Sequence, residues 1–483
     1  MAVEKKKEYK IVIGSLYGDE GKGVTVQWLC KKELDEGKKP LVVRYSGGAQ
    51  AAHTIMQKLD NGNILRHVCS SLGSGVLLGV DTYLDENFFL DPIMLMEEID
   101  VLQIELAESG SSLGKSFHPK VWINDWCRVV TPYDVIANRK DVKILSDGTC
   151  GKGIFTTCRR YSEQFHMNPL KKVSMRSKEL TLTEIFKNPQ AYLDKVKKYY
   201  DIPASGDLKD LDWKLASDLN ISTIDELDWK FCDAITRITR LMKSPQEYIK
   251  LRDEDFRRSG LYDTIIYESS QGLLLDAHHG FDPFTTSSLV GLNGLPASIV
   301  SNPDPEEASR TEVYLVTRTF LTRHGMGTSE AHIRYVYGDN MFSGAVDDEY
   351  EYNEDNDFQK HFHKAVYDTR LFYRALDRHC MDNYKVRFNL VITHADAIDR
   401  FIKNTHADYT ENIKMPQSWN WNNGKVQDYK YFPVIDMNGN IQEVVNIHEF
   451  RKVLYEKNRL NPSRCMFSSF WYCDNPFSEF KRC

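Results

Sequence analysis

The strongest chemical signal in the sequence is a glycine-rich segment, GSLYGDEGKG, at residues 14–23. Its glycines let backbone N–H groups turn toward a phosphate, and Lys22 adds a full positive charge beside them. The segment is not a strict Walker A motif, because Gly23 stands where a magnesium-binding Ser or Thr is expected. Asp19 is then the natural metal ligand, since magnesium beside phosphates takes hard oxygen ligands. We expect this loop to bind a nucleotide phosphate together with Mg²⁺.

A second segment, RYSGGAQAAHT at residues 44–54, repeats the pattern of a strand followed by a glycine turn and ends in His53 and Thr54. The carboxyl ends of neighbouring parallel strands meet at one edge of a sheet. His53 can therefore lie beside the first loop, on the same side of the sheet as Asp19.

Both loops require strands that point the same way. Residues 10–14 and 41–45 are short apolar runs typical of strands, and residues 24–34 between them have helical spacing. Strand, helix and strand form a βαβ unit, which predicts a parallel sheet. Similar apolar runs recur at residues 263–267, 313–317 and 388–392. We expect one large sheet assembled from distant segments.

The composition is that of an ordinary globular protein. Of 483 residues, 41% are hydrophobic and 27% are charged, which rules out a disordered chain. The net charge of -7 disfavours a protein that binds nucleic acid by neutralising phosphates. Ten cysteines without CxxC spacing argue against a zinc site and fit a reducing cytoplasm. We find no secretory signal or membrane-length apolar run, so we expect a cytoplasmic protein.

The two glycine-rich segments together resemble the adenylosuccinate synthetase family, whose members join aspartate to a 6-oxopurine nucleotide with GTP. Further matching segments follow in order from about residue 10 to the C-terminus: 148–154 (GTCGKGI), 267–276 (YESSQGLLLD), 284–288 (FTTSS), 322–327 (TRHGMG) and 392–399 (ITHADAID). The resemblance implies an α/β, P-loop-like fold with a large, central, mostly parallel sheet flanked by helices. It also implies a homodimer. Residues 1–9 would be a tail and 10–483 a single domain, with insertions near 201–228 and 338–357.

The resemblance also implies catalytic roles. Asp19 would remove the purine N1 proton and bind Mg²⁺ together with Ala52, while His53 would act as the acid at the 6-oxygen. Removing the proton makes that oxygen a nucleophile for the γ-phosphoryl group of GTP, and Lys22 would neutralise the developing charge. An amine would then displace the 6-phosphate. Gln271 would hold the purine base.

Nucleotide contacts are likewise carried over from the family. Thr286 and the turn at 148–153 would hold the 5′-phosphate, and either Arg159 or Arg160 would reach across the dimer interface. Asp396 would read guanine, with His394 in place of the family's lysine. The full expected set is Gly18, Asp19, Glu20, Gly21, Lys22, Gly23, Gln50, Thr54, Thr149, Cys150, Arg159, Arg160, Thr286, His394 and Asp396.

The sequence departs from the family pattern where the amino donor should bind. The family has consecutive arginines there, whereas residues 359–364 read QKHFHK and contain none. The donor would then be held by Lys360, His361, His363 and Lys364. Lysine lacks the bidentate fork of arginine, so aspartate is retained as the donor only narrowly over other amines. Cys150 also replaces a threonine, which leaves the acceptor open among IMP, dIMP, GMP and dGMP, and ATP stays possible in place of GTP.

Three other interpretations compete with this one. A related phage branch acts on dGMP, but it lacks the aspartate that this chain keeps as Asp19. A regulatory protein that binds nucleotide without ligation is the alternative from another class, and a P-loop kinase is disfavoured by the missing Ser or Thr after Lys22. The polar segment 201–228 is predicted to be a surface insertion of short helices. The acidic run 347–357 is predicted to be a solvated, mobile loop without a catalytic role.

Overall fold

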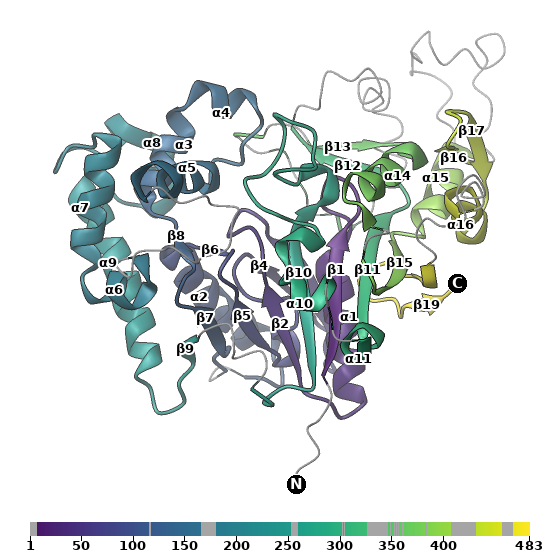
Figure 1. The fold of residues 1–483 in the computed structure, drawn as a ribbon, viewed down its shortest axis with the longest axis horizontal. Helices are drawn as coiled ribbons and strands as arrows, with labels where there is room; N and C mark the ends of the chain where they lie inside the picture. Colours follow the sequence, from purple (N-terminus) through teal and green to yellow (C-terminus); the bar gives the residue numbers. More distant parts are fainter. Residues whose placement is uncertain are drawn as a thin grey trace.

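The computed structural model describes residues 7–483 except for 115–116, 166–179, 253–258, 302, 304, 326–345, 348, 352, 354, 356, 360–361, 382–383, 407–430 and 456–466. A large twisted sheet runs through the middle of the molecule and is flanked by helices (Figure 1). The predicted α/β fold with a mostly parallel central sheet is confirmed.

The central sheet has ten strands, and every neighbouring pair is parallel except the edge pair β18 and β19. In spatial order the strands are β19 (Lys481–Arg482), β18 (Phe467–Tyr472), β15 (Arg387–Thr393), β11 (Thr311–Arg318), β1 (Glu8–Gly14), β10 (Thr264–Gly272), β2 (Pro40–Arg44), β5 (Asp81–Leu84), β7 (Val121–Asn124) and β9 (Ile249–Arg252).

All five predicted strands form adjacent members of this sheet, as β15, β11, β1, β10 and β2. The predicted helix is α1 (Lys22–Asp35), which connects β1 to β2. These two strands are not neighbours, however, because β10 lies between them and pairs with both. The centre of the sheet is therefore completed by chain that arrives more than two hundred residues later. β1 begins at Glu8, inside the predicted tail; the division into tail and single domain stays a prediction.

Small sheets and helices surround the central sheet. The small sheets pair β3 (His53–Lys58) with β4 (Ile64–Cys69), β6 (Phe89–Leu90) with β8 (Arg128–Val129), β12 (Leu321–His324) with β13 (Phe362–Ala365), and β14 (Tyr367–Asp368) with β16 (Phe432–Ile435) and β17 (Ile441–Val444). The remaining α-helices are α2 (Pro92–Ser109), α3 (Pro132–Lys140), α4 (Val142–Ser146), α5 (Ile154–Phe165), α6 (Leu182–Lys187), α7 (Pro189–Tyr200), α8 (Lys209–Leu219), α9 (Ile224–Met242), α10 (Ala297–Val300), α11 (Pro305–Ser309), α14 (Thr369–Arg378), α15 (Ala397–His406) and α16 (Ile447–Tyr455). Short 3₁₀ helices occur at Val76–Leu78, Leu273–Leu275 and Leu292–Gly294.

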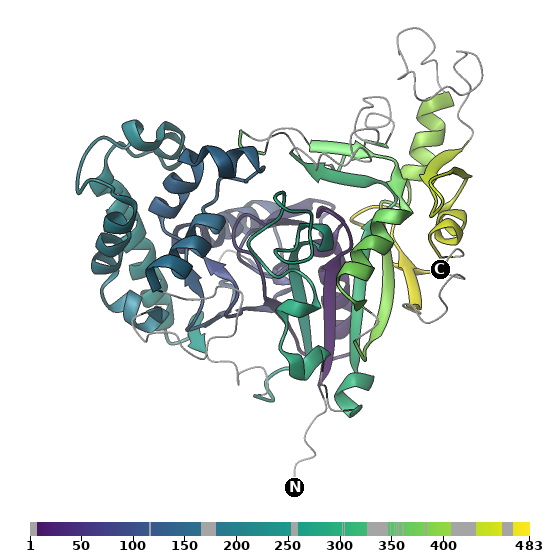
Figure 2. The ribbon, with the colours of Figure 1, turned by 45° about the horizontal axis from the view of Figure 1, so that its top comes forward.

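Several helices gather at the two ends of the sheet, while α1, α10 and α11 lie near its centre (Figure 1). In Figure 1, α3, α5, α7 and α8 lie at the left, whereas α15 and α16 lie at the right with β16 and β17. The β12–β13 ribbon crosses the end of the sheet at which β1 finishes, which is the top of both views (Figures 1 and 2). This end carries the loops that follow the parallel strands, where ligands bind in folds of this kind.

Residues 201–228 contain the short helix α8 and the start of α9, and more than half of them are exposed, as predicted for a surface segment; their assignment as an insertion stays a prediction. Some of their apolar side chains nevertheless join the core. Leu215 of α8 is buried, and so are Ile224 and Leu227 at the start of α9. α9 itself is 19 residues long, begins with a capping box at Thr223 and packs against α2. The apolar face of α9 thus contributes to the hydrophobic core around β7 and α2. Among the described residues, no helix is long and apolar enough to span a membrane.

Candidate active site

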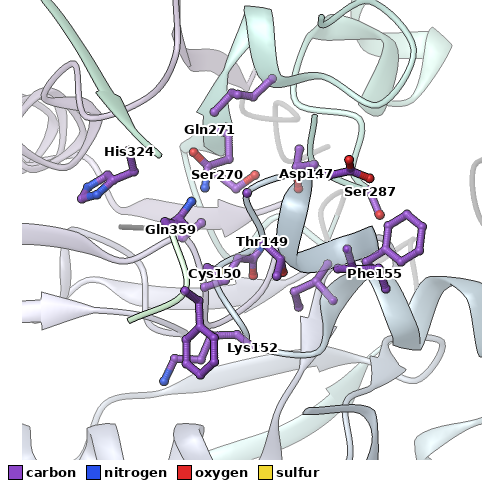
Figure 3. A pocket seen from close by; sticks show the side chains of 18 of the residues that line it. Asp147, Thr149, Cys150, Lys152, Phe155, Ser270, Gln271, Ser287, His324 and Gln359 are labelled. Atoms are coloured by element: carbon purple, nitrogen blue, oxygen red, sulfur yellow. The ribbon is translucent and has the colours of Figure 1, made fainter. Parts of the chain in front are cut away.

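A cavity of about 1110 Å³ opens at the carboxyl ends of β1, β2 and β10. It is bounded on another side by α4, α5 and the turn between them (Figure 3). Ten of the predicted site residues line it: Asp19, Lys22, Gln50, Ala52, His53, Thr149, Cys150, Arg159, Gln271 and Thr286. The parallel sheet therefore brings both glycine-rich segments and the ESSQG turn to one place.

The loop from Gly14 to Lys22 is folded for binding an anion. Gly18 and Gly21 have φ values of 92° and 90°, and Asp19 between them has a φ of 58°, a left-handed conformation that glycine adopts readily and aspartate only occasionally. Inside the loop the buried Glu20 carboxylate accepts hydrogen bonds from the N–H groups of Leu16 at 2.8 Å and Gly18 at 2.9 Å. The Lys22 ammonium lies 3.3 Å from the same carboxylate. The loop's own Glu20 carboxylate thus engages two backbone donors and the lysine, which shows that the geometry of the loop suits anionic oxygens.

Asp19 is held at the edge of the cavity through its backbone. Its carbonyl accepts a hydrogen bond from the Arg318 guanidinium, and its carboxylate lies 3.5 Å from His324 Nε2. Arg318 in turn forms an ion pair of 2.5 Å with Glu351. Burial alone would raise the pKa of Glu351, but Arg318, His394 and Lys364 together outweigh burial and lower this pKa to about 2.

The acidic run 347–357 differs from the expected solvated loop at one residue, Glu351. Glu351 is buried against Arg318, and Asp347 pairs with Lys364. Asp355 and Asp357 line the cavity. Glu351 thus packs onto the site, whereas the other described carboxylates of the run, Asp347, Glu349, Asp355 and Asp357, are exposed, as a solvated loop predicts. The mobility of the run stays a prediction.

His53 begins β3 and is almost fully buried. Its Nδ1 lies 2.5 Å from the carboxylate of Glu268, and its Nε2 lies 3.3 Å from the Ser270 carbonyl. Burial lowers the pKa of His53, against the opposing effect of Glu268. Burial would raise the pKa of Glu268, but His53 and Arg44 together hold it at about 2. An ionised Glu268 therefore orients the imidazole and favours its charged form.

The sequence patterns did not single out Glu268, although it lies inside the ESSQG match. A glutamate following the buried apolar run 265–267 was the available signal, because ionisable groups are rarely buried in a strand without a partner. Ser74 also holds the Glu268 carboxylate in place, because its backbone N–H and its hydroxyl both donate hydrogen bonds to it.

Gly23 has a structural role and does not line the cavity. A Cβ at this position would lie 3.0 Å from the Cβ of His53 and 3.2 Å from the hydroxyl oxygen of Ser74. Both contacts are tighter than ordinary packing, so glycine lets the start of α1 pass close to β3. This explains physically why no Ser or Thr stands at the Walker position. Gly18, Glu20, Gly21 and Thr54 also lie outside the cavity lining among the predicted residues.

Comparison with known proteins agrees with this geometry. The family model described as adenylosuccinate synthetase matches residues 11–354. The chain belongs to the adenylosuccinate synthetase family. Members of this family are carbon–nitrogen ligases.

Individual relatives are distant. The chain is similar to the adenylosuccinate synthetase of Nitrosomonas europaea, with 26% identity over 340 residues that cover 68% of this chain and 66% of the relative. It is 27% identical over 324 residues to that of Bordetella avium, covering 66% and 63%. The matched segments therefore span about two thirds of these relatives' length. A structure of fully ligated adenylosuccinate synthetase from Plasmodium falciparum shares the fold, with a TM-score of 0.52 and 17% identity over 93% of this chain and 86% of that one.

The match to the adenylosuccinate synthetase model ends before two of the predicted motifs, the guanine-reading residues and the donor segment. The guanine motif follows β15, next to the phosphate loop: the Thr393 hydroxyl donates to the Glu20 carbonyl at 2.7 Å. Burial and the charge of Arg318 hold the pKa of His394 well below its usual range. Asp396 forms an ion pair with Arg400. Neither His394 nor Asp396 lines the cavity, so a guanine pocket would lie beyond it.

The described cations of the donor segment, residues 359–364, are not part of the cavity lining. Lys364 is buried and paired with Asp347 and Glu351, and His363 lies opposite Arg323 in the β12–β13 ladder. Neither residue lines the cavity. Lys360 and His361 fall outside the described residues.

The two candidate interface arginines differ sharply. Arg160 is fully buried, with Nε and Nη2 each 2.8 Å from Asp134, and it does not line the cavity. Arg159 is partly exposed, lines the cavity and forms an ion pair of 3.0 Å with Asp141. Of the two arginines, Arg159 is therefore the accessible one, and its role at a dimer interface stays a prediction.

Proposed function

We propose that the protein joins an amino acid, with L-aspartate first, to C6 of an IMP-like 6-oxopurine nucleotide through a 6-phosphoryl intermediate formed from GTP. One observation carries this proposal: Asp19, His53 and Lys22 line the same cavity although they come from two separate strand ends. A base, an acid and a phosphate-binding cation are the groups that activation of a purine 6-oxygen needs.

The chemistry follows from the placement of these side chains. Asp19 accepts the N1 proton, so that the 6-oxygen gains the electron density to attack the γ-phosphorus. The O6–P bond forms while the bond from that phosphorus to the leaving GDP oxygen breaks, and Lys22 offsets charge on the transferred oxygens. His53, held by Glu268, donates to the 6-oxygen. The amine then attacks C6, and inorganic phosphate leaves with the former 6-oxygen.

Magnesium fits this site as the expected cofactor. Asp19 offers a carboxylate and Ala52 a backbone carbonyl, and both residues line the cavity that contains Lys22. Hard oxygen ligands beside a phosphate-binding lysine match the preferences of Mg²⁺. When bound, the ion would neutralise charge on the phosphate oxygens.

GTP is the favoured phosphoryl donor because Asp396 follows a strand that lies beside the phosphate loop. The hydrogen bond from Thr393 to the Glu20 carbonyl couples the two segments. A carboxylate in such a place can accept from the guanine N1 and N2 donors, whereas adenine offers no matching pair. To bind guanine in this way, the Asp396 carboxylate must either accept from guanine and Arg400 at the same time or give up its ion pair with Arg400. We further propose a cytoplasmic homodimer with Arg159 at its interface.

The test is a substrate matrix read by mass spectrometry and by phosphate release. IMP, dIMP, GMP and dGMP are each offered with twenty amino acids and either GTP or ATP in the presence of Mg²⁺. We expect the product mass of adenylosuccinate with IMP, aspartate and GTP. A product from dGMP alone would instead identify an acceptor of the phage type. Nucleotide binding without phosphate release in any combination would refute ligation and favour a regulatory role, which the arginine-free donor segment would then explain.

A further inference from the structure

Arg323 is a buried cation that lines the cavity. It lies on β12, and only 3% of its surface is exposed. Its guanidinium carbon is 4.6 Å from the ring centre of Tyr17 and 5.9 Å from that of Phe284. Contact with two aromatic faces orients a guanidinium and leaves its N–H groups, which lie in the plane, for other partners.

No anion balances this guanidinium in the described part of the chain. Its Nε and Nη1 atoms are buried and make no hydrogen bond, and Arg323 forms no ion pair with any described residue. Desolvating a charge without a partner is costly, so such groups usually mark a place for a ligand.

Most other cations that line the cavity already have carboxylate partners. Lys22 is paired with Glu20, Arg139 with Asp212, Arg159 with Asp141 and Lys214 with Asp357. Lys143 is exposed and Lys152 is half-buried, so water can solvate their charges. Among the described cations of the lining, Arg323 is therefore the buried one whose charge is not compensated.

The position of Arg323 favours a substrate carboxylate over the nucleotide 5′-phosphate. In the β12–β13 ladder it lies opposite His363, within residues 359–364, which stand in the place of the family's donor loop. Two residues further along the chain, Gly325 packs against the backbone of Gln359. A Cβ on residue 325 would lie only 2.7 Å from the Gln359 carbonyl oxygen, so the two segments are in close contact. His324 and Gln359 lie together at one end of the cavity, and Phe155 and Ser287 lie at the other (Figure 3). Ser287 belongs to the segment 284–288, in which Thr286 is expected to hold the 5′-phosphate, although Phe284 at the start of that segment lies against Arg323.

We propose that Arg323 binds a carboxylate of the amino donor and takes the place of the arginines missing from residues 359–364. The inference rests on the proposed ligase function and adds a specificity residue to it. A planar guanidinium with free in-plane donors suits a bidentate carboxylate pair, which Lys364 cannot supply because Asp347 and Glu351 already engage it.

The first experiment measures thermal unfolding and needs no turnover. Succinate serves as a dicarboxylate without an amine, and inorganic phosphate serves as the competing anion, each with IMP present. We expect succinate to raise the Tm of the wild type more than phosphate does. Arg323→Met should raise the Tm without ligands, because it removes an uncompensated buried charge, and should abolish the succinate effect. Succinate stabilisation that persists in Arg323→Met would overturn the proposal.

The second experiment compares Michaelis constants. Arg323→Met should raise KM for aspartate by ~10- to 100-fold, the range expected when a hydrogen-bonded charge pair is lost, with KM for IMP changed less than about threefold. Arg323→Lys keeps the positive charge but lacks the two parallel N–H donors of arginine, so its KM for aspartate should lie between those of the wild type and Arg323→Met. The matched control is Arg370→Met, since Arg370 pairs with Asp368 and does not line the cavity. That variant should keep the aspartate KM of the wild type.

The outcomes separate the two proposals. A raised KM for IMP together with stabilisation by phosphate would make Arg323 a nucleotide-phosphate ligand and overturn the donor assignment. Unchanged constants for all substrates would overturn it as well, while leaving the ligase function intact. A wild type without turnover would end the proposed function, and the succinate measurement would then decide on its own whether Arg323 holds a carboxylate.

Discussion

Asp19 and His53 are two residues from different strand ends that are proposed to act on N1 and on the 6-oxygen of one purine, the two atoms attached on either side of C6. Each replacement, Asp19→Asn or His53→Asn, should lower kcat by at least ~100-fold, a typical general acid or base contribution. Asp19→Asn should change the free energy of unfolding little, whereas His53→Asn leaves the buried Glu268 carboxylate without its partner and should lower that free energy while the chain still folds. Phosphate release gives the rate, and circular dichroism checks the fold. Near-normal turnover in both variants would end the mechanism.

Glu268 is a positioning residue that acts through His53. Its ionised carboxylate favours protonated imidazole, so Glu268→Gln should lower the pKa of His53 further below the value that burial already sets. If His53 acts as an acid, the alkaline limb of the kcat profile should move to lower pH. We expect ~10-fold or more loss near pH 8 and partial recovery near pH 6.

The control for this variant is Ser74→Ala, which removes one hydrogen bond to the same carboxylate but keeps its charge. Its pH profile should match the wild type. An unshifted profile in Glu268→Gln would contradict the assigned role of Glu268, whatever happens to the rate.

At the scale of elements, one histidine joins β4 to α2. His67 Nδ1 lies 2.6 Å from Glu105 and Nε2 lies 3.6 Å from Glu98, both on α2. Burial alone would lower the pKa of His67, but the two carboxylates raise it to about 9. A folded-state pKa above the unfolded value of about 6.5 gives stability that is fully present below pH 6.5 and is lost as the pH rises through 9.

His67→Gln should therefore lower the free energy of unfolding most at pH 6, by on the order of 3 kcal/mol, and much less at pH 9.5. Urea unfolding at pH 6, 7.5 and 9.5 measures the difference. Glu105→Gln should flatten the pH dependence of stability between pH 6.5 and 9, because it removes the closer carboxylate. A difference between wild type and His67→Gln that does not depend on pH would show that the imidazole is not charged in the folded protein.

At the scale of the whole molecule, Arg160 stabilises the fold of the subunit, and by our proposal Arg159 contributes to the dimer interface. Arg160→Ala should cost about 3–5 kcal/mol of unfolding free energy, because Asp134 would be left buried without its cation. Arg159→Ala should cost about 1 kcal/mol or less, since the Arg159–Asp141 pair is partly exposed. Urea unfolding measures both losses.

Light scattering coupled to size exclusion should show a weakened dimer for Arg159→Ala. An unchanged dimer together with unchanged Michaelis constants for the nucleotides would show that Arg159 is not at the interface.

Local patterns in the sequence determined the strands, the phosphate loop and the edge of the sheet at which chemistry occurs. Apolar runs of strand length and glycine turns act over a few residues, so β1, β2, β10, β11 and β15 could be predicted without tertiary information. Because carboxyl ends of parallel strands share an edge, Asp19 and His53 could be assigned to one site from their positions alone.

Only the tertiary structure decided which charges find partners. Glu268 reaches His53 across 215 residues of sequence, and Arg318 reaches the Asp19 carbonyl across 299. Lys364 is paired away from the cavity, whereas Arg323 is left in it without an anion. Such pairings depend on packing between distant segments, and no short-range periodicity records them. Residue type thus determined what chemistry was possible, and burial determined which groups are available for it.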